Sequence, residues 1–236
     1  MKVGVTLPQF RPEVEPSLVA ARAAEVSGLD GVFVFDHLWA VGDPSRPARN
    51  AWPLLGALAG GTDRVAIGPL VARVSLLPNA VLAHNVETLH RMVGDRLIAG
   101  LGTGDQLSEP ENEAVDVPFR PADERLADLA DVCRRTCAMG VTTWVGGLSR
   151  KVHDLARTEG VVLNLWGVGP DRVAAVTDVE VTWGGVAPKE PSAVADLLAG
   201  LADAGATWAV LGPPYGVDLD PVPAVELIAA AGASLS

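Results

Sequence analysis

Short β-prone runs alternate with helical patterns eight times along this chain. The runs are Gly4–Leu7, Gly31–Phe35, Val65–Val71, Arg96–Leu101, Thr142–Val145, Val161–Leu165, Val179–Trp183 and Trp208–Leu211. Strands that alternate with helices form parallel βαβ units, and eight such units can close into a (β/α)8 barrel. We therefore predict one α/β domain over residues 1–236, with its chemistry in the loops at the carboxyl ends of the strands.

Composition narrows the possible partners. The formal net charge of −11 predicts an acidic surface and argues against nucleic-acid binding, which needs a basic footprint. No apolar run reaches the ~18 residues of a membrane span, and the first residues enter a strand without a signal-peptide pattern. Cys133 and Cys137 lie on one probable helix, where two thiols alone make a poor metal site. We expect a cytoplasmic protein with reduced cysteines and no metal.

The second strand leads into an acid and a histidine. Side chains alternate across a strand, which places Val32, Val34 and Asp36 on one face and Phe33, Phe35 and His37 on the other. Because barrel interiors favour branched aliphatic residues, we expect the valines to face the axis, the phenylalanines to face the helices, and Asp36 to point into the mouth beside His37. Both are candidate catalytic residues, since a carboxylate can orient a ligand and an imidazole can exchange protons. The alternative is a structural corner in which the pair bonds loop amides.

Two glycine-rich loops follow the fourth and fifth strands. Gly102, Gly104 and Asp105 belong to a G-x-G-x-G-D string whose spacing is not a dinucleotide fingerprint. Such a loop either lets the backbone approach a ligand or makes a tight turn. The second loop contains Gly146 and Gly147 and enters a helix beside Arg150 and Lys151. It predicts an anion site, unless these two cations are ordinary surface residues.

Aromatic and basic residues near the strand ends are further candidates. Trp166 and Trp183 end the sixth and seventh strands, where they either wall a planar ligand or pack in the core. Trp39, just after His37, is the aromatic residue that we expect in the pocket. Arg73 either faces an anion or pairs with a surface acid. The long irregular segment Gly102–Pro121 predicts a functional or mobile loop.

Several stretches together resemble the bacterial luciferase-like (LLM class) flavin- or deazaflavin-dependent oxidoreductases. The resemblance runs nearly end to end, and its ordered set is more specific than any one piece. The stretches are Gly4–Gln9, Gly28–Trp39, Pro78–Ala83, Asp95–Asp105, Trp144–Gly147 and Ala204–Trp208.

The resemblance implies a (β/α)8 barrel that binds FMN or the deazaflavin coenzyme F420 in its mouth, and it does not choose between them. Asp36 and His37 match the family's strand-two pair, and Gly102, Gly104 and Asp105 match the loop beside the ring. Gly146 and Gly147 match the phosphate loop, to which we add Arg150. The resemblance also implies a non-prolyl cis peptide at Pro69, Leu70 or Val71 that presses the backbone toward the ring.

The chain also departs from the family. It is a compact version that lacks much of the usual insertion before strand five, so its pocket is open, completed by a neighbouring subunit, or lost. From this resemblance we expect a homodimeric enzyme, an oxidoreductase or monooxygenase, that uses the cofactor for hydride transfer on an unidentified small organic substrate. The alternatives are a catalytically degenerate barrel that binds flavin or serves as a scaffold, and a phosphate-binding barrel such as a sugar isomerase.

Overall fold

A closed ring of parallel strands forms the centre of the molecule. The computed structural model describes residues 1–213 and 220–234. Its main sheet contains β1 (Lys2–Thr6), β2 (Gly31–Val34), β5 (Ala66–Pro69), β6 (Ala72–Arg73), β7 (Ile98–Gly102), β8 (Thr142–Gly146), β9 (Val162–Trp166), β10 (Val181–Val186) and β11 (Trp208–Gly212). Their spatial order is β5-β2-β1-β11-β10-β9-β8-β7-β6, and every pair is parallel.

The two strands at the ends of this order, β5 and β6, are halves of one predicted strand. β5 pairs with β2, whereas β6 pairs with β7, and an isolated bridge joins Ile67 to Leu97. The predicted third strand, Val65–Val71, therefore closes the barrel, although it is split between Pro69 and Ala72. The peptide bond between Leu70 and Val71 is cis, as the resemblance implied. The predicted (β/α)8 barrel is confirmed.

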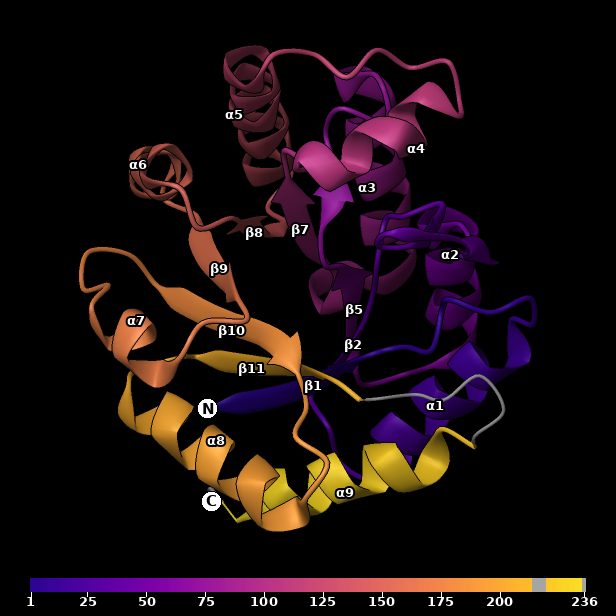
Figure 1. Ribbon diagram of the computed structural model, residues 1–236, viewed down its shortest axis with the longest axis vertical. Helices are drawn as coiled ribbons and strands as arrows, with labels where there is room; N and C mark the ends of the chain where they lie inside the picture. The colour runs from indigo at the N-terminus through magenta and orange to yellow at the C-terminus, as the bar shows by residue number, and fades with distance from the viewer. Residues whose placement is uncertain (214–219, 235–236) are drawn as a thin grey trace.

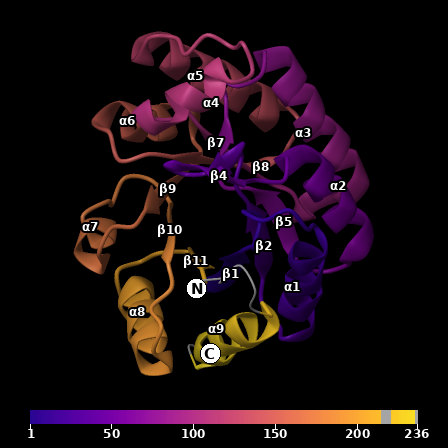
Figure 2. The same cartoon turned by 45° about the vertical axis from the view of Figure 1, so that its right-hand side comes forward.

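Helices surround the strands, and Figure 2 shows them as an outer ring. The long helices are α1 (Glu15–Val26), α2 (Ala51–Gly61), α3 (Asn79–Val93), α5 (Ala122–Ala138), α6 (Arg150–Glu159), α8 (Pro191–Asp203) and α9 (Val222–Ala233). The connection between β9 and β10 contains only the short helix α7 (Pro170–Ala174). Figure 1 shows α8 and α9 beneath β1, β10 and β11. No helix in the described residues is long and apolar enough to cross a membrane.

The long segment Gly102–Pro121 contains some regular secondary structure. It contains the 3-10 turn η2 (Gln106–Ser108) and the short helix α4 (Glu109–Glu113), and another 3-10 turn, η1 (Gly94–Arg96), follows α3. The polar segment after β2 forms an antiparallel hairpin of β3 (Trp39–Ala40) and β4 (Asp43–Pro47). Both additions lie after carboxyl ends of barrel strands.

Aromatic side chains fill the barrel axis. Phe33, Trp144 and Trp208 come from three strands that are not neighbours, yet their ring centroids lie 5.4 to 5.9 Å apart. Val32 and Val34 pack instead in the outer layer between strands and helices. The facing predicted for strand two was therefore wrong, because Phe33 points inward to Trp144 and Trp208, with which it shares the interior alongside Leu70, Ile98 and Val210.

Candidate functional site

A cavity of 780 Å³ lies at the carboxyl ends of the strands. Its wall and floor include His37 after β2, Leu70 and Val71 between β5 and β6, and residues of the loops after β7 and β8. We call it the mouth cavity. Small-molecule sites usually measure about 300–1,000 Å³ and are mostly apolar, so the mouth cavity has the size of a cofactor site.

Val71 forms part of the floor, and two glycines make room for it. A Cβ on Gly102 would lie 2.4 Å from Val71 Cγ2, and one on Gly146 would lie 2.9 Å from Cγ1. Any larger residue at either position would collide with the valine. These glycines therefore admit the Val71 side chain, which stands between two neighbouring strand ends and presents the floor to the cavity.

Aromatic residues form the opposite side of the mouth cavity. Trp166, 38% exposed at the end of β9, packs edge-to-face on Phe35 with centroids 5.7 Å apart, and Phe10 stacks on Phe35 at 5.4 Å. Gln9 fixes the Phe35 backbone, because its side chain both donates to the Phe35 carbonyl and accepts from the Phe35 amide at 2.7 Å. A second cavity of 260 Å³ shares these aromatic residues and Arg46.

A buried ionic cluster lies directly behind His37. Glu111 of α4 accepts hydrogen bonds from His37 Nδ1 at 2.7 Å, from the Leu38 amide at 2.6 Å and from Arg73 Nη2 at 3.0 Å. Burial acts to raise the pKa of Glu111, but these hydrogen bonds and the charges of His37 and Arg73 outweigh it and lower that pKa. The carboxylate is therefore kept ionised inside the protein.

Asp36 belongs to this cluster rather than to the cavity wall. Its carboxylate accepts from the Arg73 amide at 2.9 Å, and its carbonyl accepts from Arg73 Nε at 2.8 Å. The pKa of Asp36 is raised, because burial outweighs the stabilising bond from the Arg73 amide and the Arg73 charge. The expected inward orientation of Asp36 is not observed, since the chain leaves the barrel at Val34 and the strand alternation no longer applies.

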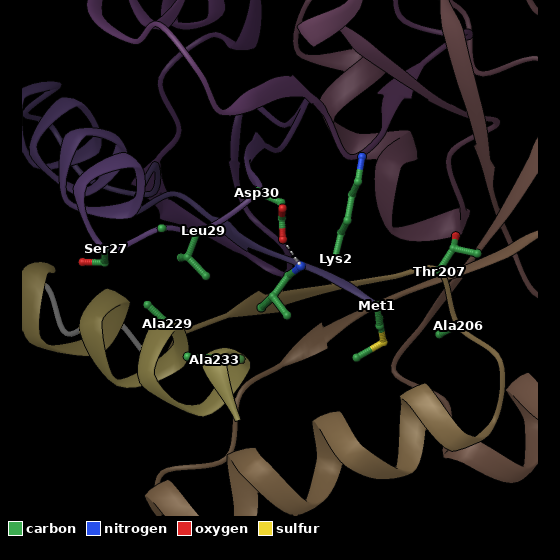
Figure 3. A pocket seen from close by; sticks show the side chains of 12 residues that line it. Met1, Lys2, Ser27, Leu29, Asp30, Ala206, Thr207, Ala229 and Ala233 are labelled. Atoms are coloured by element: carbon green, nitrogen blue, oxygen red, sulfur yellow. Dashed lines mark hydrogen bonds between the residues drawn. The ribbon is translucent and has the colours of Figure 1, made fainter. Parts of the chain in front are cut away.

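A different cavity, of 770 Å³, lies at the amino-terminal ends of β1 and β11. Figure 3 shows its lining, in which Asp30 accepts a hydrogen bond from the Val3 amide at 2.7 Å. Active sites of (β/α)8 barrels lie at the opposite, carboxyl-terminal face. The amino-terminal cavity also lacks the glycine-rich loops and the histidine. We therefore place the candidate active site in the mouth cavity.

Sequence comparison identifies the family of the chain. The family model described as luciferase-like monooxygenase matches residues 1–206. The chain belongs to this family. The luciferase-like resemblance drawn from Gly4–Gln9, Asp95–Asp105 and Trp144–Gly147 is confirmed.

Curated relatives in the luciferase-like family match part of the chain. An F420-dependent glucose-6-phosphate dehydrogenase from Kineococcus radiotolerans is 38% identical over 114 residues, which are 47% of this chain and 32% of that protein. The enzyme of the same name from Tsukamurella paurometabola is 37% identical over 146 residues, 61% of this chain and 41% of its own length. The chain thus spans about a third of the length of the curated relatives it matches.

Solved structures share the luciferase-like fold. An F420-dependent secondary alcohol dehydrogenase in complex with an F420–acetone adduct has a TM-score of 0.79 at 16% identity, with 98% of both chains covered. The FMN complex of the oxygenating constituent of 3,6-diketocamphane monooxygenase from Pseudomonas putida has a TM-score of 0.73 at 13% identity, with 97% of both chains covered. At such identities these likenesses show the fold.

The structure brings many of the predicted site residues together. Besides Gly102 and Gly146, the mouth cavity is lined by His37, Leu70, Val71, Gly104, Asp105, Gly147 and Trp166. Asp105 caps η2, where its carboxylate accepts from the Leu107 amide at 2.9 Å. Pro69 ends β5 just before the cis bond and is not among the lining residues.

Three other predicted residues lie away from the mouth cavity. Trp183 is 3% exposed in the outer layer and donates to the Val168 carbonyl at 2.7 Å, because its position on β10 faces the helices. Trp39 is in the β3–β4 hairpin and is not among the described lining residues. Arg150 is largely exposed and lies 3.8 Å from Asp154; it lines a separate cavity of 240 Å³ beyond Gly147.

Sequence reasoning missed Glu111. It lies in a segment flagged only for its length, and no local pattern distinguishes it from Glu109 or Glu113. Its 1% exposure shows its importance only after folding. Arg73 was left open between an anion and a surface acid; its partner is an acid, but a buried one.

Proposed function

We propose that this protein is a luciferase-like oxidoreductase that uses F420 or FMN to transfer hydride to or from a small organic substrate. The observation that carries the proposal is the mouth cavity, with Val71 seated between Gly102 and Gly146 on its floor and His37 on its wall. The cavity's size and apolar lining fit a planar tricyclic ring, for which the bound cofactor would supply the hydride chemistry.

The chain's own residues have separable roles in this proposal. Val71 and Trp166 hold the ring and exclude water. His37 moves a proton at the cavity wall. Gly146, Gly147 and the start of α6 receive the phosphate, because the first amides of a helix attract anions.

The neighbouring 240 Å³ cavity extends this anion site. It is lined by Gly147, Arg150, His153 and Arg172, so basic side chains lie beyond the phosphate loop. Arg150 would therefore contribute from the rim, where it is exposed to solvent. Asp36 would act by holding the Arg73 backbone rather than by touching the ring.

We base the choice of cofactor on the curated relatives. The curated relatives quoted above are named as F420-dependent, which favours the deazaflavin, whereas FMN is the alternative that the fold also accommodates. A small organic substrate would approach from the aromatic side, where the 260 Å³ cavity adjoins the mouth cavity.

A binding and turnover experiment tests the proposal. The apoprotein is titrated with F420 and with FMN while ring fluorescence is recorded, and F420 is expected to bind with a Kd on the order of micromolar. Oxidised F420 is then incubated with glucose 6-phosphate and, separately, with 2-propanol, and its visible absorbance is followed.

The outcomes separate the hypotheses. Failure to bind either cofactor contradicts the proposal. Binding without turnover on any substrate tried favours the degenerate scaffold instead. His37→Gln is the matched variant, expected to bind the ring but to lose turnover by about 100-fold, the lower range for general acid–base catalysis.

We also infer a single-domain, cytoplasmic homodimer. Cys133 and Cys137 are both free thiols, which is typical of a reducing compartment. Val41 and Leu148, 53% and 56% exposed, both line the mouth cavity, so a second subunit placed there would cover apolar surface and complete the site. Sedimentation equilibrium tests this inference, and a monomer at micromolar concentration would contradict it.

A further inference from the structure

The carboxylate of Glu111 is almost completely removed from solvent. Its side chain is 1% exposed, and Arg73 beside it is 2% exposed. A charge in such a place is costly unless it is paired and fully hydrogen-bonded. The chain meets that requirement with three donors, two side chains and one backbone amide. Such a site specifies the orientation of each partner.

The partners of Glu111 divide between its two oxygens. Oε2 accepts from the Leu38 amide and from Arg73 Nη2, at 2.6 and 3.0 Å. Arg73 is itself held, because its Nε donates to the Asp36 carbonyl. Oε1 is left for His37 Nδ1 at 2.7 Å. The carboxylate is therefore fixed by the backbone and by an arginine before it meets the histidine.

An ionised carboxylate only accepts hydrogen bonds. His37 Nδ1 must then carry the proton of this bond, and in the neutral ring Nε2 is the basic nitrogen. Within residues 1–213 and 220–234, no hydrogen bond to His37 Nε2 is present. The ring also lines the mouth cavity and is 21% exposed.

We propose that Glu111 is a positioning residue that fixes the tautomer and orientation of His37, so that Nε2 exchanges the proton in the mouth cavity. This inference rests on the proposed function for its catalytic meaning. Partners that orient a functional histidine through its other nitrogen typically change activity by about 10–100-fold when they are removed, a range known from metal-binding histidines.

The first test needs no substitution of Glu111. Imidazole ¹⁵N spectra of the wild-type protein without cofactor report which nitrogen of each of the four histidines carries a proton. The His37 signals are assigned by their loss in His37→Gln. The expected pattern for the neutral ring is a proton on Nδ1 and none on Nε2. A neutral ring with its proton on Nε2 overturns the inference.

The second test measures rates in Glu111→Gln with F420 and whichever donor supports turnover. We expect kcat to fall about 10–100-fold, while the Kd of F420 changes less than about twofold because Glu111 does not line the cavity. In a His37→Gln background, Glu111→Gln should lower kcat little further, since Glu111 acts through the histidine. The inference is overturned if Glu111→Gln keeps the wild-type kcat, or if the reductions in kcat of the two single variants multiply in the double variant.

Asn112→Ala is the matched control. Asn112 neighbours Glu111, is fully buried, and donates to the Ser75 carbonyl at 2.9 Å rather than to His37. It should loosen the same segment yet leave the His37 tautomer unchanged. If Glu111→Gln does not fold, the wild-type spectrum still decides. If the Nδ1 proton is found but no cofactor binds, the proposed function fails while the arrangement stands.

Discussion

At the residue scale, absent side chains shape the site as much as those present. Gly102 and Gly146 leave the space that Val71 occupies on the floor of the mouth cavity. Sequence reasoning interpreted these glycines as places where backbone meets ligand. The structure gives them a more specific role, because the group that would collide with a side chain at either glycine is Val71, from the connection between β5 and β6.

Gly102→Ala should therefore destabilise the protein. The new Cβ would lie 2.4 Å from Val71 Cγ2, and overpacking of a core typically costs about 1–3 kcal/mol. Val71→Ala in the same chain should recover part of that loss by removing the colliding methyl group. Urea denaturation of the two single variants and the double variant measures both effects. If Gly102→Ala lowers the free energy of unfolding by the same amount in the wild-type and in the Val71→Ala background, the explanation is contradicted.

Asp36 offers a prediction about pH. Its pKa is raised in the fold by burial, so the stability it contributes is complete below its unfolded pKa and is lost as pH rises through the folded pKa. The new side chain of Asp36→Asn cannot ionise, so this variant should not lose that stability as pH rises. The free energy of unfolding of Asp36→Asn minus that of wild type should become more positive from about pH 4 to about pH 7. A difference that stays flat or falls with pH would show that the pKa of Asp36 is not raised.

At the element scale, the segment after β7 is tied to the helix that follows it. Arg125 of α5 donates through Nη1 to the carbonyls of Thr103 and Gly104 at 2.9 and 2.8 Å, and its guanidinium lies 3.9 Å from the Phe119 ring centroid. The segment was predicted to be functional or mobile. Its buried contacts show that it is anchored at both ends and in the middle, where Glu111 and Asn112 lie.

Arg125→Met should loosen this segment. Two charge-assisted hydrogen bonds are lost, and each is worth about 1.5–3 kcal/mol at most. We expect faster amide hydrogen exchange over residues 103–121 and weaker cofactor binding. Arg134→Met on the same helix is the control, because Arg134 is 57% exposed and pairs with Glu159 on the surface, where such pairs contribute about 0–1 kcal/mol. Exchange rates over 103–121 that match wild type would contradict the proposed anchoring.

At the scale of the whole molecule, the barrel is held together from inside by aromatic contacts. Trp144, 1% exposed, contacts both Phe33 and Trp208 from other parts of the ring. The helices add the outer layer of aliphatic residues. The mouth cavity is thus the open end of a filled barrel rather than the entrance to a channel.

Trp144→Ala should weaken the entire domain. Truncation of a buried Trp typically costs about 3–5 kcal/mol, and the loss should appear in one cooperative transition because Trp144 joins distant strands. Trp166→Ala is the comparison: its exposed ring should cost less stability but weaken ring binding. Thermal and urea unfolding with cofactor titration measure both. If Trp144→Ala and Trp166→Ala lower the free energy of unfolding by similar amounts, Trp144 is not part of a stabilising inner core.

The sequence by itself determined the succession of strands and helices, since hydrophobic period and turn residues are local properties. It therefore predicted the barrel, the glycine loops and the end of the barrel at which the candidate site lies. Only the tertiary structure decided which face of strand two lies inside, because that depends on Trp144 and Trp208 from distant strands. It alone brought Glu111 to His37 across 74 residues, since a long-range pairing of buried charges leaves no local pattern.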